Sequence, residues 1–459
     1  MSDSAEIKDQ FGWIDRVGLG RKELRAWAMY DWANSAFVTT VAAAFLPLFY
    51  AQVAASEFPK VVATAYWGYT QAIALAIVAV LSPVLGAIAD YMGAKKRFLA
   101  VFMSFGVTFT ALLYFIGEGD WLLASALFIV AQVGFSGANV FYEALLPSVA
   151  RYDEVDRVST AGFAMGYVGG GILLAINAAW YLSPESFGFA DGGQAVKASF
   201  LSVAVWWALF SLPLFRTVRE PARRLGRGET AGLNPARVGF SRVATTLREI
   251  RRHPDLFVFL LAFLIYNDGV GTIMKMATVY GTEIGIGNAH MIGALLLVQF
   301  VGIPFTFAFG QFASRVSAKS GIFVCLATYA GISVFGFFMS EAWQFWMLAV
   351  GVAMVQGGIQ GLSRSLYARM IPAGRATEYF GFYSVSSKFA GIAGPLVFAV
   401  VGQSMGSSRW GIFSLVAFFA VGAVLLMRVD VAAGQKLARE EDAAMQATVQ
   451  GGASSRSSN

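Results

Sequence analysis

Long apolar segments alternate with short polar ones along almost the whole chain. Each apolar segment has about the 20 residues that an α-helix needs to cross a bilayer. The twelve segments fall at residues 31–54, 66–89, 98–117, 121–143, 158–181, 196–215, 255–280, 290–312, 320–340, 343–365, 377–402 and 410–428. The pattern predicts an all-α integral membrane protein whose twelve transmembrane helices form two bundles of six.

Composition and charge agree with this class. Hydrophobic residues make up 57% of the chain and charged residues only 14%, against about 25% charged in soluble proteins. Most of the 34 Lys and Arg residues lie near the termini, after even-numbered segments or in the central polar stretch, whereas Lys60, Lys197 and Arg409 lie in the opposite loops. Because Lys and Arg accumulate in cytoplasmic loops, we predict that both termini are cytoplasmic. The net charge of +6 therefore reflects topology, and we expect no nucleic-acid partner.

Polar stretches divide the chain into five parts. These are a cytoplasmic N-terminus (1–30), an N-terminal bundle (31–215), a basic cytoplasmic linker (216–253), a C-terminal bundle (254–428) and a cytoplasmic tail (429–459). Within the linker, Val238 to Arg252 is patterned as an amphipathic helix for the membrane surface. The tail is polar and ends in Gly and Ser, so we predict that it is disordered.

The two bundles repeat one another in sequence. The turn from Gly86 to Arg97 contains Asp90 and a basic cluster, and the turn from Gly310 to Lys319 occupies the same place 224 positions later (310 − 86). The second turn has Ser314 where the first has Asp90. Internal repeats of this kind are typical of secondary transporters, and they predict pseudo-symmetric bundles.

Twelve segments, a basic middle loop and this Gly-x-x-x-Asp turn resemble the major facilitator superfamily. The chain is also similar to the vacuole-effluxer-like family, named for an autophagy-related amino-acid exporter of yeast. The stretches that carry this similarity are 30–37, 140–147, 266–270 and 362–372, the last continuing through 378–390. The resemblance implies export of small solutes. It also implies that Asp90 and the basic residues of its turn, Arg97 among them, tie cytoplasmic helix ends together in the outward-facing state.

Polar side chains inside the apolar segments recur at helical spacing. Such stripes lie on the first, fourth, seventh, tenth and eleventh segments, and residues three or four apart share one helix face. From them we predict that Asn34, Asn139 and Gln360 contact the solute. Asp31, Glu143 and Arg364 lie near cytoplasmic helix ends, so we predict gating or pairing roles for them.

Three further charges lie deeper in the apolar segments. Asp268 and Lys388 are eleven or more residues from the segment ends, where an unpaired charge would cost at least ~2.5–3.5 kcal/mol. Lys275 follows Asp268 on the same face, about 10 Å along the helix axis. We predict that Asp268, Lys275 and Lys388 bind or couple the solute. Three intramembrane acids balance three bases, which favours a zwitterion or a solute of mixed charge.

Other polar or glycine-rich positions have structural interpretations. The isolated residues Gln71, Asn177 and Gln299 are more typical of hydrogen bonds between helices. The glycine cluster at 166–171 resembles a nucleotide loop only superficially, because no strand precedes it, and it predicts close helix packing. Gly394-Pro395 predicts a kink in the eleventh segment.

Together these features predict a monomeric secondary transporter that moves a small polar solute, an amino acid or similar zwitterion, by alternating access. We expect efflux across a bacterial inner membrane, coupled to protons through Asp268 first and Asp31 or Glu143 second. One cysteine and two distant histidines form no metal or catalytic group, so we expect neither an enzyme nor a cofactor or metal. The alternative is a non-transporting receptor or scaffold that keeps the transporter fold.

Overall fold

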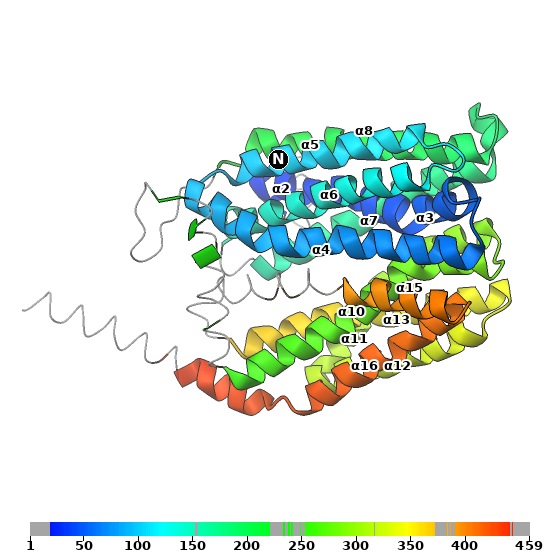
Figure 1. Cartoon of the computed structure of the whole chain (residues 1–459). Coiled ribbons are helices and arrows are strands. Elements are labelled where there is room, and N and C mark those ends of the chain that lie inside the picture. The colour runs from blue at the N-terminus through cyan, green and yellow to red at the C-terminus, as the bar shows by residue number, and fades with distance from the viewer. Residues whose placement is uncertain are drawn as a thin grey trace, which may run out of the picture.

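The structure is a computed structural model that describes residues 19–151, 155–220, 253–315, 317–371 and 391–440, with a few isolated residues between these ranges. All regular elements within these ranges are helices (Figure 1). The first span runs without interruption from Lys22 to Ala54. It consists of α2 (Lys22–Ala36), the π-helical η1 (Phe37–Phe45), α3 (Leu46–Phe49) and a second π-helical piece, η2 (Tyr50–Ala54).

The remaining helices follow the predicted order. In the first half they are α4 (Lys60–Met92), α5 (Lys95–Leu112), η3 (Leu113–Phe115), α6 (Trp121–Val149), α7 (Val155–Leu182), η4 (Pro184–Phe187) and α8 (Gly192–Thr217). In the second half they are α10 (Pro254–Glu283), α11 (Asn288–Arg315), α12 (Ala318–Phe338), α13 (Ala342–Arg369), α15 (Ala393–Ser404) and α16 (Ser408–Met427). Among the described residues, ten helices are long and apolar enough to span a bilayer, and 288–302 and 393–404 are shorter apolar helices. The all-helical membrane architecture predicted from the hydrophobic pattern is confirmed.

The helices pack as two bundles that lie side by side, and the helices of both run in about the same direction (Figure 1). In the first bundle α2 packs on α7 and α8, and α6 packs on α4 and α5. In the second, α13 packs on α11 and α12, and α16 packs on α10, α12 and α15. The bundles meet chiefly where α4 contacts α15 and α10, where α7 contacts α11, and where η1 contacts α10 and α11.

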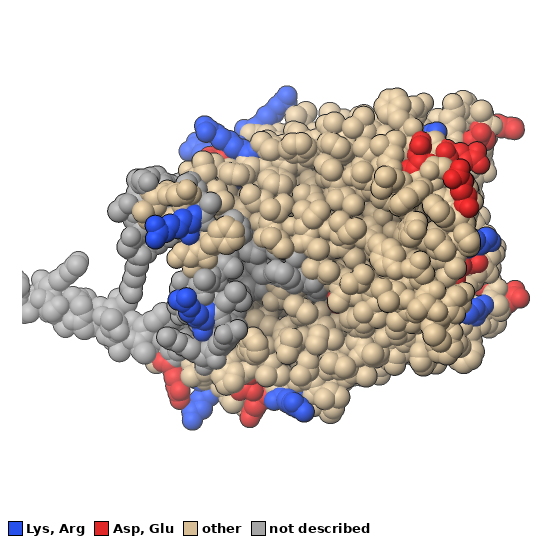
Figure 2. All heavy atoms as spheres, viewed as in Figure 1, with Lys and Arg blue, Asp and Glu red and all other residues tan. Residues whose placement is uncertain are grey.

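The surface matches a bilayer environment. Charged side chains gather at the two ends of the molecule, and an uncharged band separates them (Figure 2). Large apolar side chains point outward within this band, among them Val80 (65% exposed), Phe105 (50%) and Leu209 (54%). A helix satisfies its own backbone hydrogen bonds, so it is one of the few structures that can cross lipid. The chain is an integral membrane protein.

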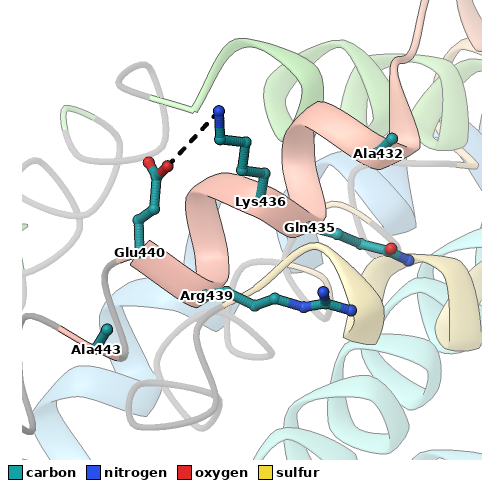
Figure 3. A pocket seen from close by; sticks show the side chains of 6 residues that line it. All are labelled: Ala432, Gln435, Lys436, Arg439, Glu440 and Ala443. Atoms are coloured by element: carbon teal, nitrogen blue, oxygen red, sulfur yellow. Dashed lines mark ion pairs between the residues drawn. The ribbon is translucent and has the colours of Figure 1, made fainter.

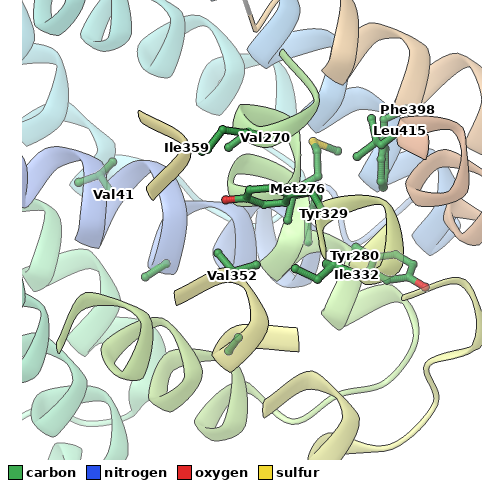
Figure 4. Close-up of a cluster of buried hydrophobic side chains, with 14 of the residues drawn as sticks. Val41, Val270, Met276, Tyr280, Tyr329, Ile332, Val352, Ile359, Phe398 and Leu415 are labelled. Carbon is green, nitrogen blue, oxygen red and sulfur yellow. The ribbon is translucent and has the colours of Figure 1, made fainter. Parts of the chain in front are cut away.

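The apolar core continues across the boundary between the bundles. Val41 of the first span belongs to the same buried cluster as Met276, Tyr280 and Phe398 of the second bundle (Figure 4). This continuity means that the two bundles are packed together over part of their shared face.

The tail differs from the prediction of disorder at its beginning, because residues 431–440 are helical. The backbone N–H of Asp430 donates to Asp255 Oδ1 at 2.8 Å, and the buried Val429 anchors the segment. A hollow lies along this helix, where Lys436 pairs with Glu440 at 3.9 Å (Figure 3). Most of the proposed amphipathic helix at 238–252 lies outside the described residues.

Candidate functional site

The two ends of the molecule differ in how the bundles touch. We call the end where α2 begins and α16 ends the termini end, and the opposite end, where α4 and α11 begin, the far end. The helices alternate in direction between these ends (Figure 1). The depth of a residue can therefore be followed from its position along its helix at 1.5 Å per residue.

Asp268 lies about halfway along α10 and is buried, with 1% of its surface exposed. Its Oδ1 accepts a hydrogen bond of 2.9 Å from the backbone N–H of Gly394, in the first turn of α15. The first N–H groups of a helix have no partner within the helix and carry partial positive charge. Asp268 thus caps α15 from a neighbouring helix, which satisfies its own buried carboxylate.

α15 begins just before this cap. Gly391 has a φ of +112°, a conformation open to glycine, and α15 begins at Ala393. Pro395 falls in the first turn of α15, where its missing N–H costs nothing. Because residues 387–390 lie outside the described residues, the predicted kink at Gly394-Pro395 stays a prediction. Lys388 lies outside the described residues.

The close approach of α15 to α10 requires glycine at position 394. A Cβ there would lie 2.6 Å from Asp268 Oδ1 and would also collide with Thr272 Oγ1. Thr272 in turn donates to the backbone carbonyl of Asp268 at 2.7 Å. Asp268, Thr272 and Gly394 thus form one tight contact between the helices.

Lys275 lies at the boundary between the bundles. Its Nζ packs over Gly391, where an added Cβ would be 2.8 Å away, and over Gly271, at 3.5 Å. Its backbone carbonyl accepts a hydrogen bond of 3.3 Å from Trp67 Nε1 of α4. Among the described residues, no carboxylate lies within 4.0 Å of this ammonium. As predicted, Asp268 and Lys275 share a face without forming a direct pair.

Asp31 lies in α2, in the termini half of the first bundle. The Tyr142 hydroxyl donates to Asp31 Oδ2 at 2.8 Å, and Trp27 stacks on the Tyr142 ring with centroids 4.6 Å apart. A Cβ on Gly162 of α7 would lie 2.6 Å from Asp31 Oδ2. Sequence reasoning missed Tyr142, although it directly precedes Glu143 in the stretch 140–147.

Each bundle contains one amide pair, and the two pairs join equivalent helices within their own bundles. Asn34 donates to Asn139 at 2.6 Å, joining the first and fourth spans. Gln360 donates to Asn267 at 2.8 Å, joining the seventh and tenth spans. The structure thus brings two of the predicted binding residues, Asn34 and Asn139, into direct contact, and it leaves Gln360 exposed.

The other predicted gating residues are more exposed. Glu143 and Arg364 are both exposed, and the Arg364 guanidinium lies 5.4 Å from the centre of the Phe163 ring on α7, across the boundary between the bundles. The side chain of Asp90 lies outside what the structure describes, and Arg97 is exposed. Two lysines hold the turn: Lys95 Nζ donates to the Ala144 carbonyl of α6 at 3.0 Å, and Lys96 Nζ donates to the carbonyls of Phe215 and Val218 where α8 ends.

Lys319 performs the same task in the second bundle. Its Nζ donates to the carbonyls of Met427 at 3.2 Å and Val429 at 2.8 Å, where α16 ends. The last carbonyls of a helix lack partners and carry partial negative charge. A lysine at the start of the third helix of each bundle therefore fixes the end of the sixth.

A polar network joins the bundles at the far end and was not predicted from the sequence. Gln52 and Asn288 exchange two amide hydrogen bonds of 2.7 and 3.0 Å, and Asn288 also donates to Tyr181 at 2.6 Å. Nearby, the Tyr69 hydroxyl donates to Gln403 at 2.5 Å. These bonds, with that from Thr278 to the Ala43 carbonyl at 2.8 Å, hold the far end closed.

Two structural interpretations from the sequence can be checked directly. Asn177 donates to Ser202 at 2.9 Å, so its role between helices is confirmed. The glycine cluster also packs as predicted, since a Cβ on Gly170 would lie 3.0 Å from Thr39. Gln71 differs, because its Nε2 is buried and has no hydrogen-bond partner within the described part of the chain.

Comparison with known proteins places this architecture in a family. Residues 58–439 match the model of the family described as "Vacuole effluxer Atg22 like". The chain is 41% identical to an uncharacterized MFS-type transporter, YxiO of Bacillus subtilis, over 88% of this chain and 94% of that one. It is 21% identical to autophagy-related protein 22 of Coccidioides immitis, over 95% and 90% of the two chains.

A solved structure shares the fold at low sequence identity. The inward-facing, unoccupied structure of a bacterial homologue of the human lysosomal transporter Spinster matches with a TM-score of 0.62 and 15% identity, over 90% of this chain and 96% of that one. The 41% identical relative is named as a transporter and not as an enzyme, in agreement with the prediction. By its family match, its 41% identical relative and its fold, the chain belongs to the vacuole effluxer Atg22-like family of major facilitator transporters.

Proposed function

We propose that the chain is a secondary active transporter of a small zwitterionic solute, such as an amino acid, bound between Asp268 and Lys275. The observation that carries this proposal is that the two opposite charges share a face of α10 without pairing. The Nζ of Lys275 reaches back to Gly271, three residues beyond Asp268. A zwitterion bound along this face would present its ammonium to Asp268 and its carboxylate to Lys275.

The transport cycle uses the contacts at the far end. The hydrogen bonds of Gln52, Asn288 and Tyr181 join the bundles there, so this conformation corresponds to a state closed toward the far side. Rocking of the bundles would break this network and expose the site to the far side, as alternating access requires. The Arg364–Phe163 contact at the other end is a candidate for the opposing gate, to which Glu143 and Asp31 would contribute.

Orientation and direction follow from charge and family. We place both termini in the cytoplasm of a bacterium, with the far end outside the inner membrane, because Lys and Arg concentrate at the termini end. Export is the direction that the vacuole effluxer family name supports. Asp268 is the first candidate for proton coupling, because its buried carboxylate accepts a hydrogen bond at the start of α15, the helix that contacts α4 of the first bundle.

The proposal predicts that Asp268→Asn abolishes coupled transport or exchange in proteoliposomes. The asparagine carbonyl keeps an acceptor for Gly394, so the fold should persist, whereas the charge that binds or couples is lost. A matched control is Asp430→Asn. Asp430 caps the helix at the beginning of the tail, and this substitution should leave transport unchanged. Unchanged exchange by Asp268→Asn would remove Asp268 from the site, and no exchange by the unmodified protein would favour a receptor or scaffold.

A further inference from the structure

We propose that Gln71 and Lys275 together bind the carboxylate of the transported solute, one donor from each bundle. The inference rests on the proposed function and names the chemical group that this part of the site recognises. It adds Gln71 as a second donor to a carboxylate whose charge Lys275 requires.

Gln71 is the first observation. Its side chain is 1% exposed, and its Nε2 has no hydrogen-bond partner among the residues that the structure describes. A buried amide donor without an acceptor destabilises the folded protein, and buried polar groups in native structures are nearly always paired. Asn177, the other buried amide predicted to link helices, has its partner in Ser202. A donor that the fold leaves unmatched is suited to an acceptor brought by a ligand.

The position of Gln71 on α4 directs it toward Lys275. One turn before it, Trp67 donates to the Lys275 carbonyl. One turn after it, Leu75 Cδ1 and Lys275 Nζ pack on the same point above Gly391, at 3.3 and 2.8 Å from a Cβ placed there. Residues 67, 71 and 75 share one helix face, so Gln71 lies between two contacts that both involve Lys275.

Lys275 is the second, independent observation. Its ammonium has no carboxylate within 4.0 Å among the described residues, yet it lies in the membrane interior, where unpaired charge is costly. It also lies beside Gly391, which directly precedes the first turn of α15, the positive end of that helix. An anion at this point would satisfy the ammonium and the Gln71 amide together, and hydrogen bonds to a charged acceptor are stronger than neutral ones.

The arrangement explains how binding could be linked to movement of the bundles. Gln71 belongs to α4 of the first bundle and Lys275 to α10 of the second, and these helices meet at the boundary. A carboxylate bound by both donors would connect the bundles, whereas an amide or ester would lack the charge that Lys275 requires. Substrates are therefore expected to carry a carboxylate.

The test measures ligand binding to the purified full-length protein. The probes are the standard α-amino acids, screened by thermal shift, followed by the α-carboxamide of each amino acid that raises the melting temperature. We expect the acids to bind and the carboxamides to bind at least tenfold more weakly. Gln71→Leu should weaken binding of the acids by about tenfold, the value of one hydrogen bond to a charged group, and Lys275→Met should weaken it further.

A second readout separates ligand binding from a structural role. Because Gln71→Leu removes an unmatched buried donor, it should raise the melting temperature of the ligand-free protein. The control Asn177→Leu breaks a satisfied bond, so it should lower that temperature and leave affinity for the acids unchanged.

Three results would overturn the inference. Equal affinity for acids and carboxamides would show that no carboxylate is recognised. Unchanged affinity in Gln71→Leu, or a melting temperature lowered as in Asn177→Leu, would assign Gln71 to helix packing while leaving the proposed function in place. If no amino acid stabilises the unmodified protein, the zwitterion class proposed above fails, and the carboxylate subsite fails with it.

Discussion

The two bundles each bury a carboxylate beside a glycine, but they satisfy it in different ways. In the first bundle Asp31 accepts from the hydroxyl of Tyr142, and Gly162 leaves the space for it. In the second, Asp268 accepts from the backbone of Gly394, which is also the glycine that leaves the space. The first acid is held by a side chain of its own bundle. The second holds the first turn of α15, a helix that contacts the other bundle.

This difference indicates a division of labour. α15 packs on α4 of the first bundle, so a change at Asp268 acts directly on the boundary that must move during transport. A change at Asp31 acts first on the packing of α2, α6 and α7. The lysines at the helix ends behave alike in both bundles, so the asymmetry is specific to the acids. The following predictions test it in order of expected effect.

The largest effect is expected for Gly394→Ala. The new Cβ would meet Thr272 Oγ1 and Asp268 Oδ1, forcing α15 away from α10 and disturbing the contact with α4. We expect transport in proteoliposomes to be lost and the melting temperature to fall, with overpacking costing about 1–3 kcal/mol. The control is Gly361→Ala, which has nothing within 4 Å of the added Cβ. If Gly394→Ala transports normally, the tight contact between α15 and α10 has no role in transport.

Gly162→Ala is the matched change in the first bundle. Its Cβ would lie 2.6 Å from Asp31 Oδ2 and 2.8 Å from the Trp27 ring. We expect a similar loss of stability, about 1–3 kcal/mol, but a smaller loss of transport than for Gly394→Ala. Thermal unfolding and transport rates measured on the same preparations check this. Equal transport defects in the two variants would contradict the division of labour between the acids.

Tyr142→Phe removes the donor to Asp31 and keeps the ring that stacks on Trp27. Leaving a half-buried carboxylate without this donor should cost about 1–3 kcal/mol. A double-mutant cycle with Asp31→Asn measures the coupling, for which we expect about 0.5–3 kcal/mol. Strict additivity of the two changes would show that the hydroxyl and the carboxylate do not stabilise one another.

The smallest effect is expected for the amide pairs. Asn139→Ala removes the acceptor of the buried Asn34, which should cost about 1–2 kcal/mol because a buried donor loses its partner. Gln360→Ala removes an exposed donor and should cost about 0.5 kcal/mol or less. Chemical or thermal unfolding distinguishes the two. A larger loss of stability in Gln360→Ala than in Asn139→Ala would contradict this order.

The length and apolarity of the segments were enough to predict the fold class. Each transmembrane helix must satisfy its own backbone in lipid, so segment length and apolarity identify a span without knowledge of its neighbours. Helical spacing also placed Asp268 and Lys275 on one face of α10, because that relation depends on a single helix. The lysines at 96 and 319 were visible as a repeated basic turn, although their carbonyl partners were not.

Contacts between helices required the tertiary structure. The far-end network of Gln52, Asn288 and Tyr181 joins three spans that are distant in sequence, and no local pattern distinguishes these residues from other polar positions near helix ends. The missing partner of Gln71 is likewise a property of what surrounds it, and the sequence pattern assigned it the opposite role. The length, apolarity and helical faces of each span are properties of one segment and could be read from the sequence. The partner of each buried polar group depends on which helices meet, and this was decided only by packing.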